Sequence, residues 1–325
     1  MRFEHQFPES PCAYSAAHLA ALDHTLALIA GSEWGDGLVL RGSMTMRAWI
    51  GEQARPPGDL DWIMPTGTAF PDPLAPFPYL DDIARAQQWP EALDGAARYR
   101  MWTEEEFDTF GSRPKLPPEG LRWLQAEEYE PFSLLDQVAD IIRDNPNAPG
   151  GVVLDADDIS QDENWIYAHL DEDTGRRLLV PWDYGTESGA IQLDFAIGEW
   201  LPETPVWTAV PRSDGGPPTP VVTASRELSL AWKVLWLDTD STDERMAAGK
   251  DLYDAVLLAE SPQTRMTPGL LRKVLGNRFP RVNADRIQGW SVDWSGFRRT
   301  HPGVHGEVDG WLERLARALP CAAIS

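Results

Sequence analysis

The chain has 325 residues, of which 42% are hydrophobic and 24% are charged, and these proportions are typical of a globular protein with one large domain or two smaller ones. Its formal net charge of −23 argues against a general nucleic-acid-binding protein, because a polyanion would be repelled. The apolar runs fall short of the roughly 18 residues that a membrane span needs, so we expect no membrane association.

The first predicted elements are a helix, a strand, a second helix and a second strand. Residues 15–30 have helical periodicity after a serine that suits a helix N-cap. A strand is expected at about 37–41, and it leads into a turn at Gly42-Ser43 and a helix at about 43–51. Asp59-Leu60-Asp61 begins the next strand.

The middle of the chain is more irregular. Residues 65–118 are rich in proline, acidic and aromatic residues, and we expect an insertion of loops and short helices there. A short amphipathic helix is expected at 133–143. Extended segments separated by glycine, aspartate and threonine turns follow at 150–154, 164–170, 176–182 and 190–197.

A stretch rich in proline and glycine at 211–220 is the predicted domain boundary, and beyond it the pattern is helical to about residue 319. The sequence therefore predicts an α+β fold. The core would span residues 1–215, and a mainly helical C-terminal domain would span residues 221–325.

The expected compartment is the cytoplasm. The chain has two cysteines, Cys12 and Cys321, which lie near its opposite ends and do not form a metal-binding spacing. So few cysteines are typical of a protein in a reducing setting, and the alternative is a disulfide between the two ends. The first residues also lack the basic stretch followed by an apolar core that marks a secretory signal.

Charge is distributed unevenly along the chain. Residues 1–200 hold 13 basic and 36 acidic side chains, whereas residues 262–325 hold 10 basic and 5 acidic ones, a local balance of +5. A polyanionic partner would therefore be met by the C-terminal segment. The alternative is that these basic residues form a solvated helix face.

The aspartates at 59 and 61 are the main candidates for chemistry. Side chains alternate along a strand, so both carboxylates lie on one face and repel each other unless a cation sits between them. Oxygen ligands of this kind suit Mg²⁺ carrying a triphosphate. Gly42 would let the backbone approach the phosphates, and Ser43 would donate a hydroxyl at a helix N-terminus. This combination favours a nucleotidyltransferase active site.

Three later residues are candidates for the same site. Asp194 lies within an apolar strand, and an antiparallel neighbour strand would bring it beside the two aspartates as a metal ligand or proton acceptor. Lys233 is the only basic residue in the apolar helical stretch from Leu228 to Leu237, and it would contact the β- and γ-phosphates. Asp251 and Asp254, three positions apart, share a helix face, and one of them would orient this lysine or the base.

The order of these motifs resembles the AbiEii/AbiGii family of nucleotidyltransferase-like toxins, over roughly residues 37–260. The resemblance is carried by Gly42-Ser43, Gly58-Asp59-Leu60-Asp61, Ile191-Gln192-Leu193-Asp194-Phe195, Lys233 and Lys250-Asp251-Leu252-Tyr253-Asp254. It implies a polymerase-β-like core with a mixed sheet and flanking helices, followed by a helical domain.

The resemblance also implies an activity and partners. Asp59, Asp61 and Asp194 would bind Mg²⁺ or Mn²⁺ and the NTP, Lys233 would contact phosphate and Asp251 would complete the pocket. The expected reaction is the transfer of a nucleotide to RNA, with the tRNA 3′ end meeting the basic C-terminal segment. A separately encoded antitoxin would be the protein partner in a toxin–antitoxin or phage-defence system.

Two other functions are compatible with the residues. The same core would modify a small molecule such as an antibiotic, because the acidic N-terminal half would attract a cationic acceptor. The glutamate that usually precedes the helix lysine in this family is replaced by Trp232, which favours a protein that binds a nucleotide or a partner without catalysis.

Overall fold

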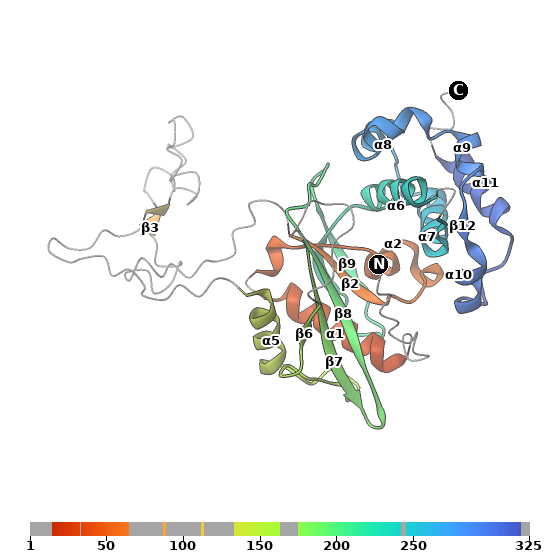
Figure 1. Cartoon of the computed structure of the whole chain (residues 1–325). Coiled ribbons are helices and arrows are strands. Elements are labelled where there is room, and N and C mark those ends of the chain that lie inside the picture. The colour runs from red at the N-terminus through yellow and green to blue at the C-terminus, as the bar shows by residue number, and fades with distance from the viewer. Residues whose placement is uncertain are drawn as a thin grey trace. The chain divides into compact units, whose positions relative to one another are not determined.

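The computed structural model describes residues 15–32, 34–64, 87–88, 112–113, 133–162, 175–241 and 245–319. The chain divides into two compact units, one made of Met1–Thr68 with Leu134–Ser325 and one made of Ala69–Ser133. In the smaller unit, the described residues form an antiparallel pair of β3 (Gln87–Gln88) and β4 (Ser112–Arg113). The other described elements belong to the larger unit (Figure 1).

A mixed sheet forms the centre of the larger unit, and its described part has eight strands (Figure 1). The strands are β1 (Val39–Arg41), β2 (Asp59–Met64), β5 (Val153–Leu154), β6 (Ser160–Gln161), β7 (Gly175–Tyr184), β8 (Glu187–Ile197), β9 (Val206–Val210) and β10 (Thr219–Thr223). Their order is β5-β7-β8-β2-β1-β10-β9, with β6 pairing to β7. The predicted α+β class with a mixed sheet is confirmed.

The strand that carries Asp194 is a neighbour of β2, as expected, but the predicted direction was wrong. β8 pairs parallel to β2, with Asp61 opposite Asp194, and antiparallel to β7. β7 begins at the end of the sheet where β2 finishes and runs back to the end where β2 starts, so that β8 leaves from there parallel to β2. β8 then forms a hairpin with β7 on one side and a parallel ladder with β2 on the other.

The two faces of β2 have different surroundings. Leu60 and Trp62 are fully buried on one face, and α1 (Ala16–Ala30) packs against β2, β7, β8 and β10. Asp59, Asp61 and Ile63 lie on the other face. Ile63 belongs to a core cluster shared with the C-terminal helices. The two aspartates therefore lie on the sheet face that is turned toward those helices.

Local sequence signals account for the helices that flank the sheet. The hydroxyl of Ser15 accepts a hydrogen bond from the backbone N–H of His18 at 3.1 Å, so it is the N-cap of α1, as predicted. α5 (Leu134–Asp144) buries one face and packs against α1. α2 (Ser43–Ile50) packs against β1, β2 and β9.

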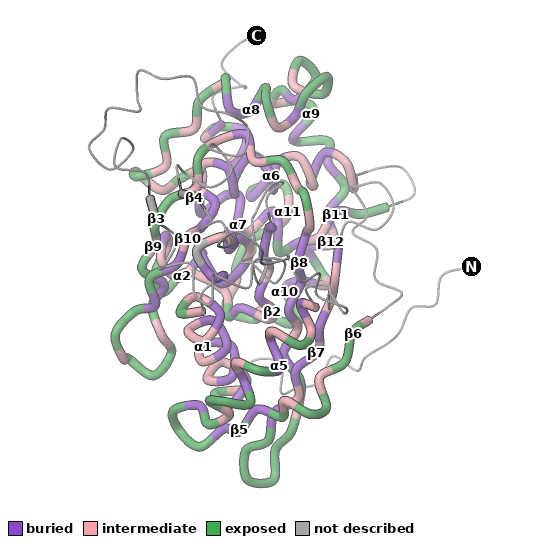
Figure 2. The backbone as a smooth tube through the Cα atoms, turned by 90° about the vertical axis from the view of Figure 1, so that its left-hand side faces the viewer, coloured by how far each residue is buried: buried purple, intermediate pink, exposed green. Residues whose placement is uncertain are grey.

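The C-terminal part is mainly helical, as predicted, with a short parallel pair of β11 (Ala247–Ala248) and β12 (Val292–Asp293). Its α-helices are α6 (Arg226–Asp240), α7 (Gly249–Glu260), α8 (Pro268–Leu275), α9 (Ala284–Gln288), α10 (Trp294–Thr300) and α11 (Val308–Ala318). Short 3-10 helices lie at Gly35–Gly37, Gly51–Gln53 and Gly276–Arg281. Buried residues continue from the sheet into α6, α7 and α11 (Figure 2).

The hairpin of β9 and β10 was not predicted. The proline- and glycine-rich residues 211–218 connect these two antiparallel strands, and β10 pairs parallel to β1. Residues 219–223 are thus part of the central sheet, and the division into domains at 211–220 stays a prediction. The predicted strand at 164–170 and nearly all of the insertion at 65–118 lie outside the described residues. Among the described helices, none combines the length and apolarity needed to cross a bilayer.

Candidate active site

Three carboxylates meet on the face of the sheet that is turned toward the C-terminal helices. Asp59 and Asp61 come from β2 and Asp194 comes from β8, and one ligand oxygen of each lies within 4.8 Å of the other two. The parallel register places Asp61 directly opposite Asp194. Asp59 and Asp61 are partly buried and Asp194 is buried. This donor set of hard oxygens fits a divalent cation such as Mg²⁺.

Gly42 forms the turn between β1 and α2. Both its backbone conformation and the close approach of Asp61 require a glycine at this position. Its φ is +79°, in the region that favours glycine, and an added Cβ would overlap with Asp61 Oδ2. Ser43, the first residue of α2, donates a hydrogen bond from Oγ to Asp59 Oδ1 at 3.1 Å. The Gly-Ser turn therefore contacts both aspartates of β2, and the predicted contact of Ser43 with phosphate stays a prediction.

Asp194 is held by two side chains of the sheet. Arg177, opposite Asp194 on β7, donates from Nε to Oδ1 and from Nη2 to Oδ2, both at 2.7 Å. Gln192 donates a third hydrogen bond to Oδ2 at 2.9 Å. The sequence analysis missed Arg177, although an arginine directly before the apolar run Leu178-Leu179-Val180 of an extended segment indicates a polar partner within the sheet.

Arg41 is a second arginine beside the carboxylates that the sequence analysis missed. It lies opposite Asp61 on β1 and is only 3% exposed. Its Nη1 donates to both carboxylate oxygens of Glu199, at 2.8 and 2.7 Å, and its guanidinium lies 5.4 Å from the ring centroid of Trp232. The segment that follows β8 is thereby tied to β1, next to the Gly-Ser turn.

The proximity of the carboxylates changes their protonation. Burial and the negative charge of Asp59 raise the pKa of Asp61 to about 7, against the opposing effect of Arg41. Lys250, an exposed residue in the first turn of α7, also acts to lower the pKa of Asp61. Burial raises the pKa of Asp194, and Arg177 opposes this. A bound cation would relieve this repulsion.

Lys233 lies in a buried cluster of four charges. It is 3% exposed, and its Nζ lies 2.9 Å from Asp251 Oδ1 and 3.0 Å from Asp254 Oδ2. Arg55, from the loop before β2, also pairs with Asp254 Oδ2 at 3.2 Å. Burial alone would lower the pKa of Lys233, but Asp254 and Asp251 outweigh it and the pKa is raised. The cluster joins α6 and α7 to the start of β2.

The structure thus places Lys233 beside both Asp251 and Asp254, of which the sequence predicted one as its partner, and adds Arg55 to the cluster. The charge of Arg55 also interacts with that of Asp59, so the cluster adjoins the carboxylate site. No sequence pattern marks Arg55, because its partner Asp254 is 199 positions away. The phosphate contact of Lys233 and the catalytic role of Asp251 stay predictions.

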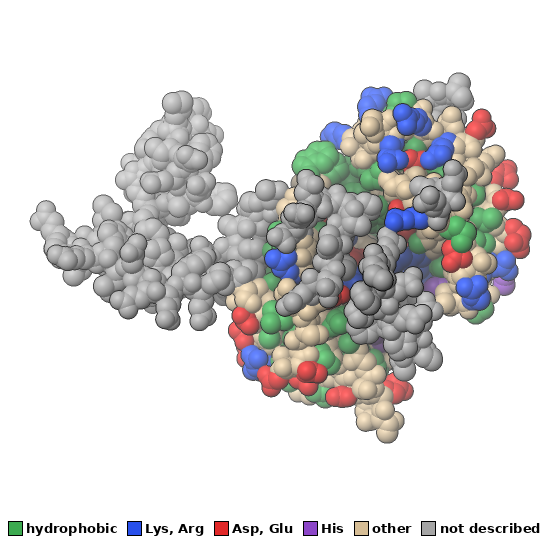
Figure 3. Space-filling view, viewed as in Figure 1, with side chains coloured by type: hydrophobic (Ala, Val, Ile, Leu, Met, Phe, Trp, Pro, Cys, Tyr) green, Lys and Arg blue, Asp and Glu red, His purple; other side chains and the backbone are tan. Residues whose placement is uncertain are grey.

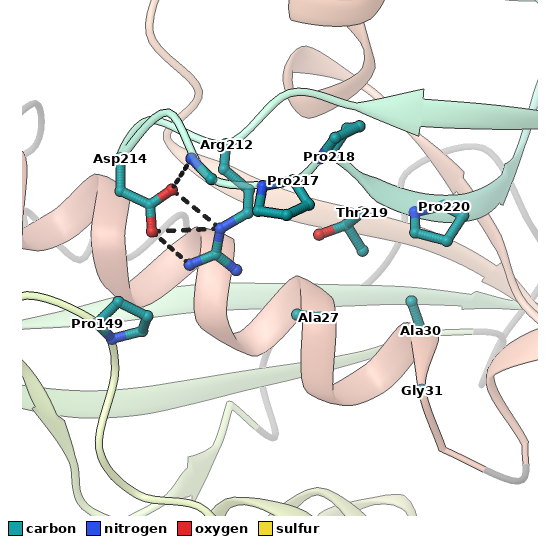
Figure 4. A pocket seen from close by; sticks show the side chains of 11 residues that line it. Ala27, Ala30, Gly31, Pro149, Arg212, Asp214, Pro217, Pro218, Thr219 and Pro220 are labelled. Atoms are coloured by element: carbon teal, nitrogen blue, oxygen red, sulfur yellow. Dashed lines mark hydrogen bonds and ion pairs between the residues drawn. The ribbon is translucent and has the colours of Figure 1, made fainter.

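A surface hollow of about 570 Å³ lies elsewhere on the larger unit. It is formed by the last turn of α1, Pro149 and the loop before β10, and Arg212 and Asp214 pair with each other at its wall (Figure 4). Its lining includes none of the predicted site residues.

Comparisons with known proteins agree with the predicted family. Residues 130–314, more than half of the chain, match the model of the family described as nucleotidyl transferase AbiEii toxin, type IV toxin–antitoxin system. MenT4, a nucleotidyltransferase toxin of Mycobacterium tuberculosis H37Rv, is similar in structure with 15% identity and a TM-score of 0.47, over 96% of this chain and 85% of that chain. JHP933 of Helicobacter pylori is also similar in structure, with 12% identity and a TM-score of 0.46, over 95% of this chain and 90% of that chain. No curated protein matches the sequence.

Replacing Gly42 by Ala should both destabilise the protein and weaken metal binding. The positive φ costs an alanine about 1–3 kcal/mol, and the added Cβ pushes Asp61 out of place. The free energy of unfolding and the affinity for Mn²⁺ are the measurements. Gly58→Ala is the matched control, because a Cβ there meets no atom within 4 Å. Equal Mn²⁺ affinity in Gly42→Ala and wild type would contradict the role of the turn.

The contribution of Asp61 to the stability of the metal-free protein should fall as the pH rises from about 4 to about 7. In this range Asp61 keeps its proton in the folded protein, whose pKa is about 7, but loses it in the unfolded chain, whose pKa is near the ordinary 3.8. The unfolded chain therefore binds fewer protons, and a rising pH favours it. Urea unfolding in EDTA measures this. Asp61→Asn should flatten the pH profile, whereas Asp183→Asn, at an exposed position on β7, should not. Parallel profiles for wild type and Asp61→Asn would refute the assignment.

Replacing Lys233 by Met should lower the free energy of unfolding by about 3–5 kcal/mol, because two buried carboxylates lose a partner. Chemical denaturation measures the loss. Lys250→Met removes the same side chain from an exposed position and should cost far less. Similar losses in the two variants would show that the buried pairs are not what stabilises α6 against α7.

Proposed function

The chain belongs to the family of AbiEii nucleotidyltransferase toxins, and on this premise we propose that it transfers a nucleoside monophosphate from an NTP to the 3′ end of a tRNA, with Mg²⁺ held by Asp59, Asp61 and Asp194. The single observation that carries the proposal is the meeting of these three carboxylates on one sheet face, within 4.8 Å of one another. Asp59 and Asp61 repel each other at this distance, and a cation between them would remove that repulsion.

The proposed roles follow from the geometry of each residue. Mg²⁺ would neutralise the triphosphate and polarise the phosphorus under attack. Asp194 would be the third metal ligand, and a carboxylate oxygen of the cluster that the metal leaves open would accept the proton of the attacking hydroxyl. The acceptor oxygen would then bond to the α-phosphorus as pyrophosphate leaves.

The two lysines would have different roles. Lys233 is engaged by Asp251 and Asp254, so in this proposal it reaches phosphate only by giving up one of these partners. Lys250 is exposed and its charge reaches Asp61, so we assign it the first contact with the incoming triphosphate. Asp251 would hold Lys233 in position for the β- and γ-phosphates.

The proposed RNA surface is the basic end of the molecule. Basic side chains gather over α8 and its surroundings (Figure 3). Arg272 and Lys273 of α8, and Arg278 and Arg281 of the 3-10 helix that follows, are exposed. Lys and Arg side chains in such a patch bind phosphates without reading sequence. RNA would therefore approach from α8, and a separately encoded antitoxin would be the protein partner.

The test is transfer of label from each α-³²P NTP to total tRNA by the purified full chain in Mg²⁺. We expect label on tRNA with one NTP, and its loss in Asp61→Asn, because a metal ligand is removed. Label should also be lost when the tRNA is oxidised with periodate, which destroys the 3′ hydroxyl group.

Two results would contradict the proposal. Label on a cationic small molecule in an acceptor panel, with none on tRNA, would make the protein a small-molecule transferase that uses the same site. Nucleotide binding without any transfer would indicate a protein that keeps the fold for binding alone.

A further inference from the structure

The three carboxylates of the candidate site differ in how their oxygens are used. Ser43 donates one hydrogen bond to Asp59, whereas both oxygens of Asp194 are bound by Arg177 and one of them also by Gln192. A carboxylate has about four lone-pair positions. Hydrogen bonds fill three of the four lone-pair positions of Asp194: one on Oδ1 and both on Oδ2. A metal ion could reach only the remaining position on Oδ1.

Arg177 also opposes metal binding by its charge. Its guanidinium lies 2.7 Å from each oxygen of Asp194, so a divalent cation bound to that carboxylate would be close to a second positive charge. The two cations therefore compete for Asp194. A site with Arg177 in this position binds a metal mainly through Asp59 and Asp61.

Arg177 is well placed to change partners. Its side chain is 24% exposed while that of Asp194 is 9% exposed, so the guanidinium lies on the more open side of the pair. β7 holds its backbone directly opposite Asp194. A guanidinium binds phosphate oxygens with the same two-pronged geometry that it uses on a carboxylate. A triphosphate entering beside the aspartates would offer it a more highly charged partner.

We propose that Arg177 couples nucleotide binding to metal binding: it holds Asp194 until a triphosphate arrives, then transfers to the phosphates and releases Asp194 to complete the metal site with Asp59 and Asp61. This inference rests on the proposed function, and it adds a residue that binds substrate and controls when the third carboxylate is available. Binding linkage makes the effect reciprocal, because the triphosphate strengthens metal binding by as much as the metal strengthens triphosphate binding.

The competing explanation is that Arg177 only orients Asp194 for the metal. The two explanations predict opposite changes in metal affinity when Arg177 is removed. If Arg177 competes with the metal, its removal strengthens metal binding and weakens triphosphate binding. If it only orients Asp194, its removal weakens metal binding and leaves triphosphate binding unchanged.

The experiment measures two affinities of the full chain by calorimetry: Mn²⁺ alone, and inorganic tripolyphosphate alone in EDTA. We expect Arg177→Gln to bind Mn²⁺ about tenfold more tightly and tripolyphosphate about tenfold more weakly than wild type, each corresponding to about 1.4 kcal/mol. Gln192→Ala removes a neutral donor from the same carboxylate and should change both affinities much less. Arg177→Lys keeps the charge without the two-pronged geometry, so it should shift both affinities in the same directions as Arg177→Gln but by less. This variant tests the proposal if Arg177→Gln does not fold.

Weaker Mn²⁺ binding by both Arg177 variants, or unchanged tripolyphosphate binding, would overturn the coupling and leave the proposed function intact. Mn²⁺ binding that is the same in wild type and Asp61→Asn would instead refute the metal site, and with it both proposals. Neither affinity depends on transfer activity, so an inactive preparation still decides the question.

Discussion

The repulsion among three carboxylates on one face of the sheet is the constraint on which the rest of the candidate site depends. Alternation along β2 puts Asp59 and Asp61 side by side, and the parallel register adds Asp194. Each neighbouring element supplies a compensating group. β7 contributes Arg177, β1 contributes Arg41, and α2 begins with a hydroxyl on Asp59. Burial, together with the charge of Asp59, still raises the pKa of Asp61 against the effect of Arg41.

A second group of charges holds the helices to the sheet. Lys233 and Arg55 neutralise Asp251 and Asp254, so the buried cluster has no net charge. Such a cluster adds little stability over an apolar one but fixes which groups meet, because any other arrangement leaves a buried charge without a partner. It aligns α6 and α7 with the loop that leads into Asp59. The geometry of the carboxylate site therefore depends on packing in the C-terminal part of the chain.

The two charge groups also differ in what a ligand could change. In the buried cluster, Lys233 is held by two carboxylates, so a ligand reaches it only if one of these ion pairs opens. At the carboxylate site, Arg177 and Lys250 are more open to solvent than the groups they neutralise. Arg177 and Lys250 can therefore pair with a ligand at the carboxylate site without a movement of α6 and α7.

The sequence by itself determined the local features: the alternation that pairs Asp59 with Asp61, the glycine at the turn before α2, the capped helix α1 and the helical C-terminal part. These depend on near neighbours in the chain, so periodicity and turn residues reveal them. Only the tertiary structure decided the parallel direction of β8, the hairpin of β9 and β10, and the partners of Arg177, Arg41 and Arg55. The direction of a strand depends on the end of the sheet from which the chain enters it. The partner of a buried arginine depends on which carboxylate the fold brings beside it. Arg41 and Glu199 are 158 positions apart, and no local pattern connects residues at that separation.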